Sequence, residues 1–428
     1  MKRVTRSFKI DNPDQFKNKI FNWSKPFETS VYLDSNNYER RKGDFDSVLA
    51  VGVISKIPYT TKNSFKKLDN FISDTNDWIF GYLSYDLKNE IEDLNSKNNS
   101  SFNLPNLFFF QPEKVWIIKS KTVEAHYINE SDIEVDWRSI NLMHQIKDLK
   151  QIENVHFHPR LTKSEYLKKV TKILNHINRG DIYEANFCME WLAIESEIEP
   201  EIIFSKLNKI TKTPMSGFLK TNNFYLMSSS PERFIKKKGN KIISQPIKGT
   251  AKRDSIFKKD LKIRDKLKND PKERSENIMI VDLVRNDLSK FSVPGSVKVT
   301  ELCEVYPFKQ VNQMISTVES KLRNNKNLVD VLKSSFPMGS MTGAPKIEAL
   351  KIIDDLEVSR RGVYSGSMGY IDPNGNFDFN VIIRSILYDS SKKILSFQVG
   401  SAITSSSKPE KEFEECLLKA SPMMSIFN

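Results

Sequence analysis

The segment 373–384, PNGNFDFNVIIR, decides the fold class. After a turn at 373–376, the side chains at 377, 379, 381 and 383 are apolar, and those at 378, 380 and 384 are polar. A period of two is typical of a β-strand, so Arg384 is expected on the face opposite the apolar row. The wider segment 362–404 predicts a meander of strands. Its third strand, 394–399, precedes Gly400-Ser401-Ala402, small residues that let a ligand approach the backbone.

Upstream of this meander, the pattern alternates between further strands and isolated helices. Residues 44–51 and 115–118 have the composition of strands. A helical period begins at Thr162 and stops at Gly180, the usual residue after a helix end. Strands and helices without a regular βαβ alternation predict an α+β fold. The best boundary lies near residue 150, which divides the chain into 1–150 and 151–428, although the two parts are expected to form one intertwined domain.

Length and composition exclude several classes of protein. The chain has 428 residues, of which 39% are hydrophobic and 11% aromatic, enough to bury a core, so global disorder is excluded. No apolar run is long enough to span a bilayer, and the basic start has no apolar region behind it, so we expect no membrane association. The three cysteines, Cys188, Cys303 and Cys416, form no metal-type pair and suit structural thiols in a reducing compartment. We therefore expect a cytoplasmic protein.

The charge balance favours an anionic ligand without identifying it. There are 66 basic and 54 acidic residues, giving a net charge of +12. A nucleic-acid-binding protein concentrates its basic residues, whereas here they are spread along the whole chain. We therefore expect no nucleic-acid partner, and the excess suits a small anionic substrate or an acidic partner.

Two predicted helices carry acidic side chains that stand out. The first opens with Asp270, a capping residue, followed by Pro271. Glu276 lies one turn further on, just before an apolar run, and is expected near the buried side. The second helix begins around Pro409. There, Glu412, Glu415 and Lys419 share one stripe, which by itself is more typical of a surface row of ion pairs.

Read together, seven short blocks resemble the chorismate-utilising enzymes, a family that includes the anthranilate, aminodeoxychorismate, isochorismate and salicylate synthases. The blocks occur in the family's order over roughly residues 160–425. They are GDIYEAN (180–186), SSSPERF (228–234), QPIKGT (245–250), the stretch 270–287, SMTGAPK (340–346), RRGVYSG (360–366) and EFEE (412–415). The resemblance implies two large facing antiparallel β-sheets with helices packed outside.

One position in the third block distinguishes branches of the family. Aminodeoxychorismate synthases carry Lys where the anthranilate, isochorismate and salicylate synthases usually carry Ala, and this chain has Lys248. The resemblance therefore implies that the Lys248 amine attacks C2 of chorismate and is displaced when ammonia adds at C4, giving 4-amino-4-deoxychorismate for 4-aminobenzoate and folate synthesis. A buried amine becomes nucleophilic when its pKa falls, so we expect a lowered pKa for Lys248.

The other site residues follow from the same resemblance. Glu232 is expected to be the general acid for the departing 4-hydroxyl, and Glu276 and Glu415 are expected to bind Mg²⁺, which holds the ring carboxylate. The enolpyruvyl carboxylate is expected at a second group of residues, with further substrate contacts beside it: Arg384, Tyr364, Gly400, Thr250, Ser340 and Lys419. Ammonia is expected from a separate glutamine amidotransferase subunit.

Several departures from the family patterns bear on the branch. Glu184 stands where isochorismate and salicylate synthases carry a Lys, which counts against those two activities. Gln313 replaces a common His that anthranilate synthases use, and it also departs from the pattern expected here. Ala402 occupies a glycine position and is tolerable only where φ is negative. Anthranilate synthase component I stays the nearest alternative, and a non-catalytic basic binding protein on the same scaffold is a remote one.

Overall fold

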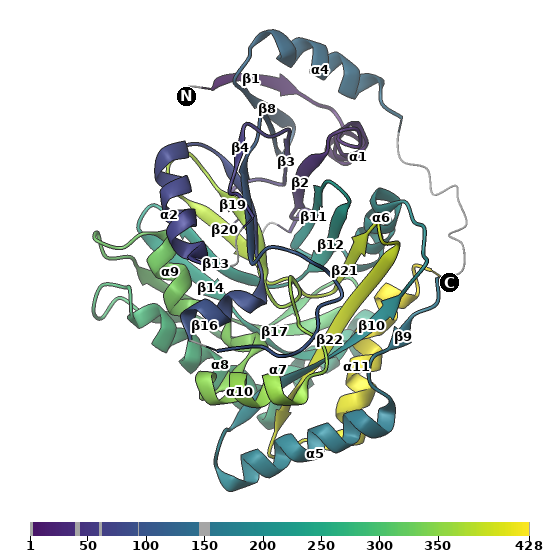
Figure 1. Cartoon of the computed structure of the whole chain (residues 1–428), viewed down its shortest axis with the longest axis vertical. Coiled ribbons are helices and arrows are strands. Elements are labelled where there is room, and N and C mark those ends of the chain that lie inside the picture. The colour runs from purple at the N-terminus through teal and green to yellow at the C-terminus, as the bar shows by residue number, and fades with distance from the viewer. Residues whose placement is uncertain (1–2, 39–42, 60–61, 93, 145–154, 428) are drawn as a thin grey trace.

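A computed structural model describes residues 3–38, 43–59, 62–92, 94–144 and 155–427. Two large antiparallel sheets form the centre of the molecule, with helices on their outer faces (Figure 1). The predicted α+β class and the two-sheet architecture are confirmed. The boundary predicted near residue 150 lies outside the described residues.

The first sheet has 12 strands. Eleven lie in the order β1 (Val4–Lys9), β8 (Thr122–Tyr127), β7 (Lys114–Lys119), β3 (Ser47–Val51), β2 (Thr29–Asp34), β11 (Met215–Thr221), β12 (Phe224–Ser230), β21 (Ser385–Asp389), β22 (Ile394–Thr404), β10 (Glu184–Ala193) and β18 (Gly343–Ala344), and β9 (His158–Pro159) pairs with β10.

The second sheet has 10 strands. Nine lie in the order β15 (Ile247–Lys252), β17 (Val311–Lys321), β14 (Lys241–Gln245), β13 (Arg233–Lys238), β20 (Phe377–Asn380), β19 (Ser367–Ile371), β5 (Ile79–Leu83), β6 (Leu107–Gln111) and β4 (Ser55–Lys56), and β16 (Lys298–Pro307) pairs with β17.

Helices cover the sheets and include the two expected to carry acids. They are α1 (Pro13–Trp23), α2 (Ser64–Thr75), α3 (Lys88–Ile91), α4 (Ser131–Leu142), α5 (Lys163–Arg179), α6 (Pro200–Thr211), α7 (Phe257–Asn269), α8 (Pro271–Ser289), α9 (Leu328–Ser335), α10 (Lys346–Leu356) and α11 (Pro409–Met424), with 3-10 turns η2 (Tyr85–Leu87) and η3 (Gly339–Met341). Among the described residues, no helix has the length and apolar character needed to cross a membrane.

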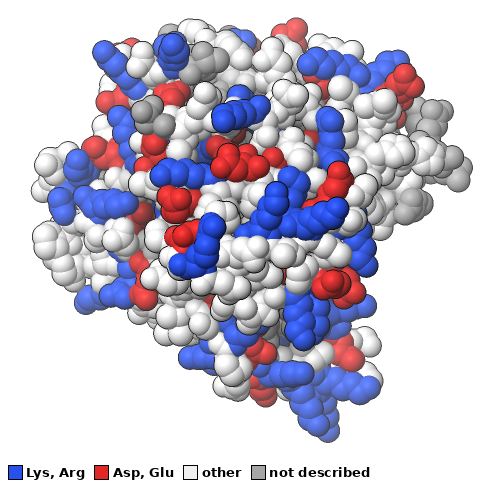
Figure 2. All heavy atoms as spheres, turned by 60° about the horizontal axis from the view of Figure 1, so that its bottom comes forward, with Lys and Arg blue, Asp and Glu red and all other residues white. Residues whose placement is uncertain are grey.

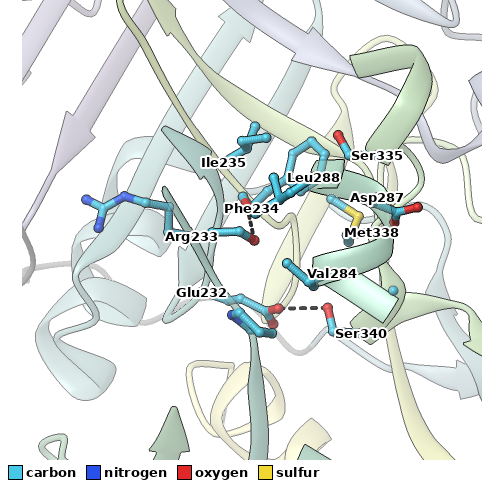
Figure 3. Close-up of a pocket in the computed structure, with 13 residues that line it drawn as sticks. Glu232, Arg233, Phe234, Ile235, Val284, Asp287, Leu288, Ser335, Met338 and Ser340 are labelled. Carbon is cyan, nitrogen blue, oxygen red and sulfur yellow. Dashed lines mark hydrogen bonds between the residues drawn. The ribbon is translucent and has the colours of Figure 1, made fainter. Parts of the chain in front are cut away.

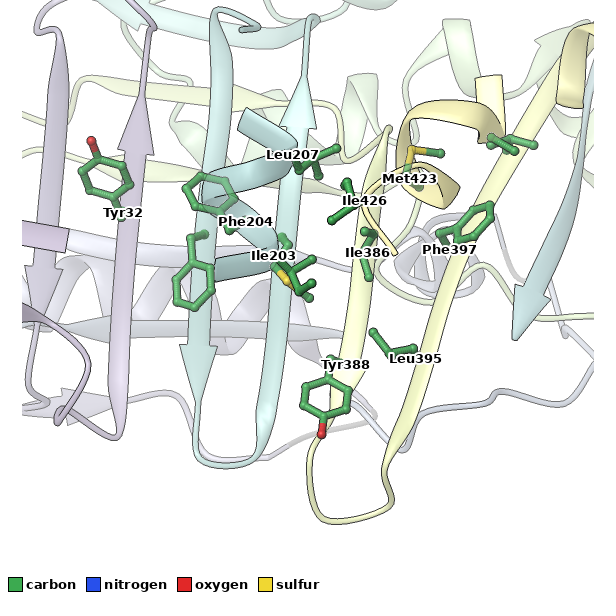
Figure 4. Close-up of a cluster of buried hydrophobic side chains, with 14 of the residues drawn as sticks. Tyr32, Ile203, Phe204, Leu207, Ile386, Tyr388, Leu395, Phe397, Met423 and Ile426 are labelled. Carbon is green, nitrogen blue, oxygen red and sulfur yellow. The ribbon is translucent and has the colours of Figure 1, made fainter. Parts of the chain in front are cut away.

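Alternating side chains bury both faces of the central strands. Along β21, Leu387 points to the core between the sheets, where it joins residues of both sheets. Its neighbours Ile386 and Tyr388 point the other way, to the core beneath α6 and α11 (Figure 4). The period of two therefore supplies two hydrophobic cores from one strand. The three cysteines are buried and unpaired, as expected.

The predicted meander at 362–404 is wrong in one respect, because its strands belong to different sheets. Strand β20 ends at Asn380, and the chain then crosses from the second sheet to β21 in the first. Val381 and Ile382 are apolar because they lie buried in this crossing, not because they continue a strand. Arg384 has a φ of 52° at the end of the crossing, so strand alternation does not place its side chain.

On the face shown in Figure 2, basic and acidic side chains are interspersed. Helix α7, in the most lysine-rich segment, has an exposed basic face and buries the acid Asp260.

Candidate active site

A cavity of about 1020 Å³ opens between the crossing at 381–384, strands β15 and β22, and helices α8 and α11. All ten side chains or backbone positions singled out from the sequence line it, although they come from segments far apart in the chain. They are Glu232, Lys248, Thr250, Glu276, Ser340, Tyr364, Arg384, Gly400, Glu415 and Lys419. The volume suits a small organic substrate.

Lys248 lies on β15 where that strand is irregular. The register against β17 shifts between Ile247 and Thr250. Gly249 has a φ of +96°, a conformation that favours glycine. Lys248 Nζ donates a hydrogen bond to Glu184 Oε1 at 2.6 Å, and the two side chains are 10% and 1% exposed. The bulge thus directs the ammonium across the cavity to β10 of the other sheet.

The expected lowering of the Lys248 pKa is wrong. Burial alone lowers this pKa, but the carboxylates of Glu184, Glu276 and Glu232 together raise it above its ordinary value of 10.5. In the free protein Lys248 is therefore an ammonium. A nucleophilic role requires a group that removes its proton.

Glu232 is held by the 3-10 turn η3. Ser340 Oγ donates to Glu232 Oε1 at 2.7 Å, and Glu232 itself is buried (Figure 3). A hydroxyl donor stabilises the ionised form of a carboxyl group. The pair is therefore arranged to support Glu232 after it has given up a proton.

Arg384 presents a guanidinium group to the cavity. Burial lowers its pKa to about 10, against the opposing effect of Glu232. Its side chain lines the cavity but has no hydrogen bond to any part of the chain that the structure describes. Its backbone carbonyl accepts from the amide of Ser229 at 3.1 Å, which fixes the position of the residue. Such a guanidinium is suited to a carboxylate ligand.

The acidic side chains gather where α8 and α11 meet the cavity. Burial raises the pKa of Glu276 to about 7, although Lys248 and Lys272 oppose this. Lys272 Nζ lies 3.7 Å from Glu276 Oε1. Burial also acts to raise the pKa of Glu415, but Lys419, whose Nζ is 2.6 Å from Glu415 Oε1, brings it below its ordinary value.

These side chains fit a magnesium ion held by few protein ligands. Mg²⁺ is commonly bound through one or two carboxylates with several waters. Glu276 and Glu415 line one cavity from separate helices, and burial raises the pKa of Glu276 although Lys248 and Lys272 oppose it. Within the described ranges no group of three or more His, Cys, Asp or Glu side chains is arranged to hold a metal.

The backbone at Gly400 and the ring of Tyr364 form another wall. A Cβ at Gly400 would lie 2.6 Å from Cys188 Sγ, so a side chain does not fit here. Lys419 Nζ donates to the Gly400 carbonyl at 2.8 Å and thereby ties α11 to β22. Ala402 lies within β22 and does not have a positive φ, which meets the condition set from the sequence.

A buried arginine connects the walls of the cavity. Arg361 donates to the carbonyls of Met341 and Asn186, both at 2.6 Å, and to Glu357. It therefore ties η3 to β10 in the core beside the site. The resemblance included Arg361 in a matching block but assigned it no role.

Sequence reasoning missed Glu184 as the partner of Lys248. Glu184 lies in the matching block 180–186, but the comparison with the family showed only that this residue is not a lysine. Gln313 was noted as a departure, and its side chain lines the cavity, 3% exposed, with no hydrogen-bond partner for Oε1 in the described parts of the chain. It lies opposite Thr250 across β15 and β17. Neither placement could be read from local spacing, because each depends on strand pairing.

Known proteins resemble this chain in sequence and in fold. The family described as chorismate binding enzyme matches residues 28–425. Anthranilate synthase component 1 of Thermus thermophilus is 31% identical over 81% of this chain and 76% of its own length. Aminodeoxychorismate synthase component 1 of Bacillus subtilis is 30% identical over 80% of this chain and 75% of its own length.

The similarity of fold extends over most of the chain. The crystal structure of anthranilate synthase component I from Streptococcus pneumoniae superimposes with a TM-score of 0.78 at 22% identity, covering 90% of this chain and 96% of that one. The two relatives named above are nearly equal in identity to this chain, so these two values do not distinguish their reactions. What the match over residues 28–425 does establish is that this chain belongs to the family of chorismate binding enzymes.

Proposed function

We propose that this chain is an aminodeoxychorismate synthase component 1, which converts chorismate and ammonia to 4-amino-4-deoxychorismate. The observation that carries the proposal is the position of Lys248, whose ammonium lies buried in the same cavity as Glu232 and Arg384. The aminodeoxychorismate branch differs from the others by a lysine at this position. The Bacillus subtilis relative, which carries that name, supports the assignment.

Some side chains of the cavity bind the substrate, and others transfer protons. Arg384 binds the enolpyruvyl carboxylate through charge-assisted hydrogen bonds, beside Tyr364 and the backbone at Gly400. The amine of Lys248 attacks C2, the ring double bond shifts, and the bond from C4 to its hydroxyl breaks. Glu232 protonates the departing oxygen so that it leaves as water, and Ser340 stabilises the carboxylate that results.

The second half of the reaction replaces the lysine by ammonia. Ammonia adds at C4, the double bond shifts back, and the bond between C2 and Nζ of Lys248 breaks. The enolpyruvyl group is retained throughout. Glu276 and Glu415 would hold Mg²⁺, which when bound supplies positive charge for the ring carboxylate. Lys419 pairs with Glu415 at 2.6 Å and orients it.

Ammonia is proposed to come from a separate glutamine amidotransferase subunit in the cytoplasm. The relatives named component 1 imply a second component. The product would then serve 4-aminobenzoate and folate synthesis.

The first test is the identity of the product. Purified protein with chorismate, Mg²⁺ and excess ammonium should give 4-amino-4-deoxychorismate by liquid chromatography and mass spectrometry. Lys248→Ala should reduce its formation at least about 100-fold, because the variant lacks the amine that forms the covalent bond to C2. Lys298→Ala, which removes an exposed lysine from the same sheet, is the matched control and should leave the rate unchanged.

The alternative is anthranilate synthase component 1, which the Thermus thermophilus relative favours. It predicts anthranilate with release of pyruvate. Pyruvate formed in proportion to chorismate consumed, with Lys248→Ala as active as the wild type, would exclude the proposal.

A further inference from the structure

The ion pair between Lys248 and Glu184 engages only one oxygen of the Glu184 carboxylate. Glu184 is 1% exposed, and only its Oε1 atom is engaged. Its Oε2 atom is inaccessible to solvent and has no hydrogen-bond partner among the described residues. A buried, half-satisfied carboxylate is costly. Its position 2.6 Å from Nζ of the proposed nucleophile points to a role in the reaction.

The backbone holds this carboxylate in a fixed position. Glu184 is the first residue of β10, and it pairs with Ala344 of β18 on one side and Thr404 of β22 on the other. Lys248 comes from the other sheet. The 2.6 Å hydrogen bond therefore joins β15 of the second sheet to β10 of the first and gives a short, defined path for one proton.

We propose that Glu184 is the proton acceptor of Lys248: its carboxylate takes a proton from the ammonium before the amine attacks chorismate and returns it when the amine is released. This inference rests on the proposed function, because it assigns how the nucleophile of that reaction becomes neutral.

The protons balance over one cycle. Transfer from Lys248 gives a neutral amine and a protonated Glu184. Attack at C2 leaves a secondary ammonium on Lys248, and Glu232 gives its proton to the hydroxide leaving C4. When ammonia adds at C4, the bond from C2 to Nζ breaks and Lys248 departs as a neutral amine. Glu184 then returns its proton to Lys248, and the new ammonium group on the product reprotonates Glu232. One ammonia is consumed and one water is released.

Water is a poor alternative acceptor for this proton. The raised pKa of Lys248 means that release to solvent is unfavourable near neutral pH. The other charged groups facing Lys248 come from the segment before β13 and from α8 and α11: Glu232, Glu273, Glu276, Glu415 and Lys419. None of these has a contact with Lys248 Nζ as short as that of Glu184 in the described chain.

The experiment measures formation of the covalent adduct on Lys248 without ammonia. Full-length protein is mixed with chorismate and Mg²⁺, quenched, and followed by intact-protein mass spectrometry as a gain of chorismate less one water. Rates for wild type and Glu184→Gln are compared from about pH 6 to about pH 9. The remaining charged neighbours are common to both proteins, so their titrations cancel in the ratio of rates.

If Glu184 accepts the proton, the ratio of the wild-type rate to the Glu184→Gln rate should change with pH in a defined way. In the wild type, the proton moves from Lys248 to Glu184 inside the protein, and because this transfer neither releases a proton to solvent nor takes one up, it does not depend on pH. In Glu184→Gln the amine must lose its proton to solvent. The ratio of wild type to variant should therefore increase about tenfold for each pH unit below the pKa of the variant's lysine and approach one at high pH.

Two further variants separate proton transfer from structure. Glu184→Asp keeps a carboxylate and should restore a ratio that is independent of pH, even if its rate is lower. Glu190→Gln removes another buried carboxylate from β10, 3% exposed, and should leave adduct formation unchanged. Thermal unfolding and chorismate binding confirm that each variant is folded.

Two outcomes would overturn the inference in distinguishable ways. If wild type forms the adduct but its ratio to Glu184→Gln is constant over the whole pH range, Glu184 is only structural and the proposed function stands. If wild type forms no adduct, the lysine chemistry of the proposed function fails, and the inference fails with it.

Discussion

Carboxylates from four segments of the chain surround the ammonium group of Lys248. Glu184, Glu232, Glu276 and Glu415 all lie close enough to affect its environment or to be affected by it. The blocks of sequence identified the lysine and three of these acids. They could not reveal its protonation state, because that depends on the distances between segments that meet only in the folded protein.

Glu276 gives a prediction about stability and metal binding. Its pKa is raised from 4.5 to about 7, with burial as the main cause. A carboxyl group with a raised pKa favours folding while it is protonated, and this contribution is lost as pH rises from the unfolded value through the folded one. Above about pH 7, ionised Glu276 should cost the free protein up to about 3 kcal/mol.

Glu276→Gln should therefore unfold at a higher urea concentration than wild type at about pH 8 without Mg²⁺, because it removes that cost. Below about pH 5 the two proteins should be nearly equal. Mg²⁺ should raise the melting temperature of the wild type and leave the variant unchanged. Equal protection of both proteins by Mg²⁺ would exclude Glu276 as a ligand. Glu319→Gln, a partly buried acid on β17 outside the cavity, is the control for the loss of a carboxylate.

At the scale of elements, the start of helix α8 determines where Glu276 lies along the cavity wall. Asp270 accepts hydrogen bonds from the amides of Lys272 and Glu273, at 3.0 and 3.1 Å, and Pro271 follows at the first helical position. This cap fixes where the helix begins, and therefore which turn carries Glu276.

Asp270→Ala should lower the free energy of unfolding by about 1 kcal/mol, because two amides at the start of α8 lose their acceptor. Urea denaturation measures the change. Asp265→Ala, on an exposed position of α7, should change it by less than about 0.5 kcal/mol. If the two variants are equally stable, the cap does not hold α8.

Helices were easier to predict than strands for a physical reason. The boundaries of α5, α8 and α11 depend on caps and periods within a few residues, and the predicted starts and the end at Gly180 are confirmed. The segment 377–384 alternates like one strand but crosses between sheets after Asn380. An apolar residue in a core crossing and one on a strand face look the same in sequence.

At the scale of the whole molecule, both sheets of the described chain contain strands from its first third and from the rest. The first sheet places β1, β2, β3, β7 and β8 beside β11 and β12, and the second places β5 and β6 beside β19. Neither sheet is complete without strands from both sides of the boundary predicted near residue 150. The core between the sheets and the core on the outer face of the first sheet also contain residues from both sides of this boundary.

Thermal or urea unfolding should therefore show one transition. Circular dichroism and tryptophan fluorescence should coincide, although four of the five tryptophans lie in the first third of the chain and only Trp191 lies beyond it. Two separated transitions, with fluorescence changing first, would indicate that the first third unfolds independently.

The solitary guanidinium of Arg384 has a practical consequence for handling the protein. A partly buried guanidinium without a hydrogen-bond partner in the described chain attracts small carboxylates from solution. Acetate or citrate in a purification buffer would occupy this position and compete with chorismate. Assays prepared in such buffers should report weaker apparent affinity than those prepared in uncharged amine buffers, with maximal turnover unchanged.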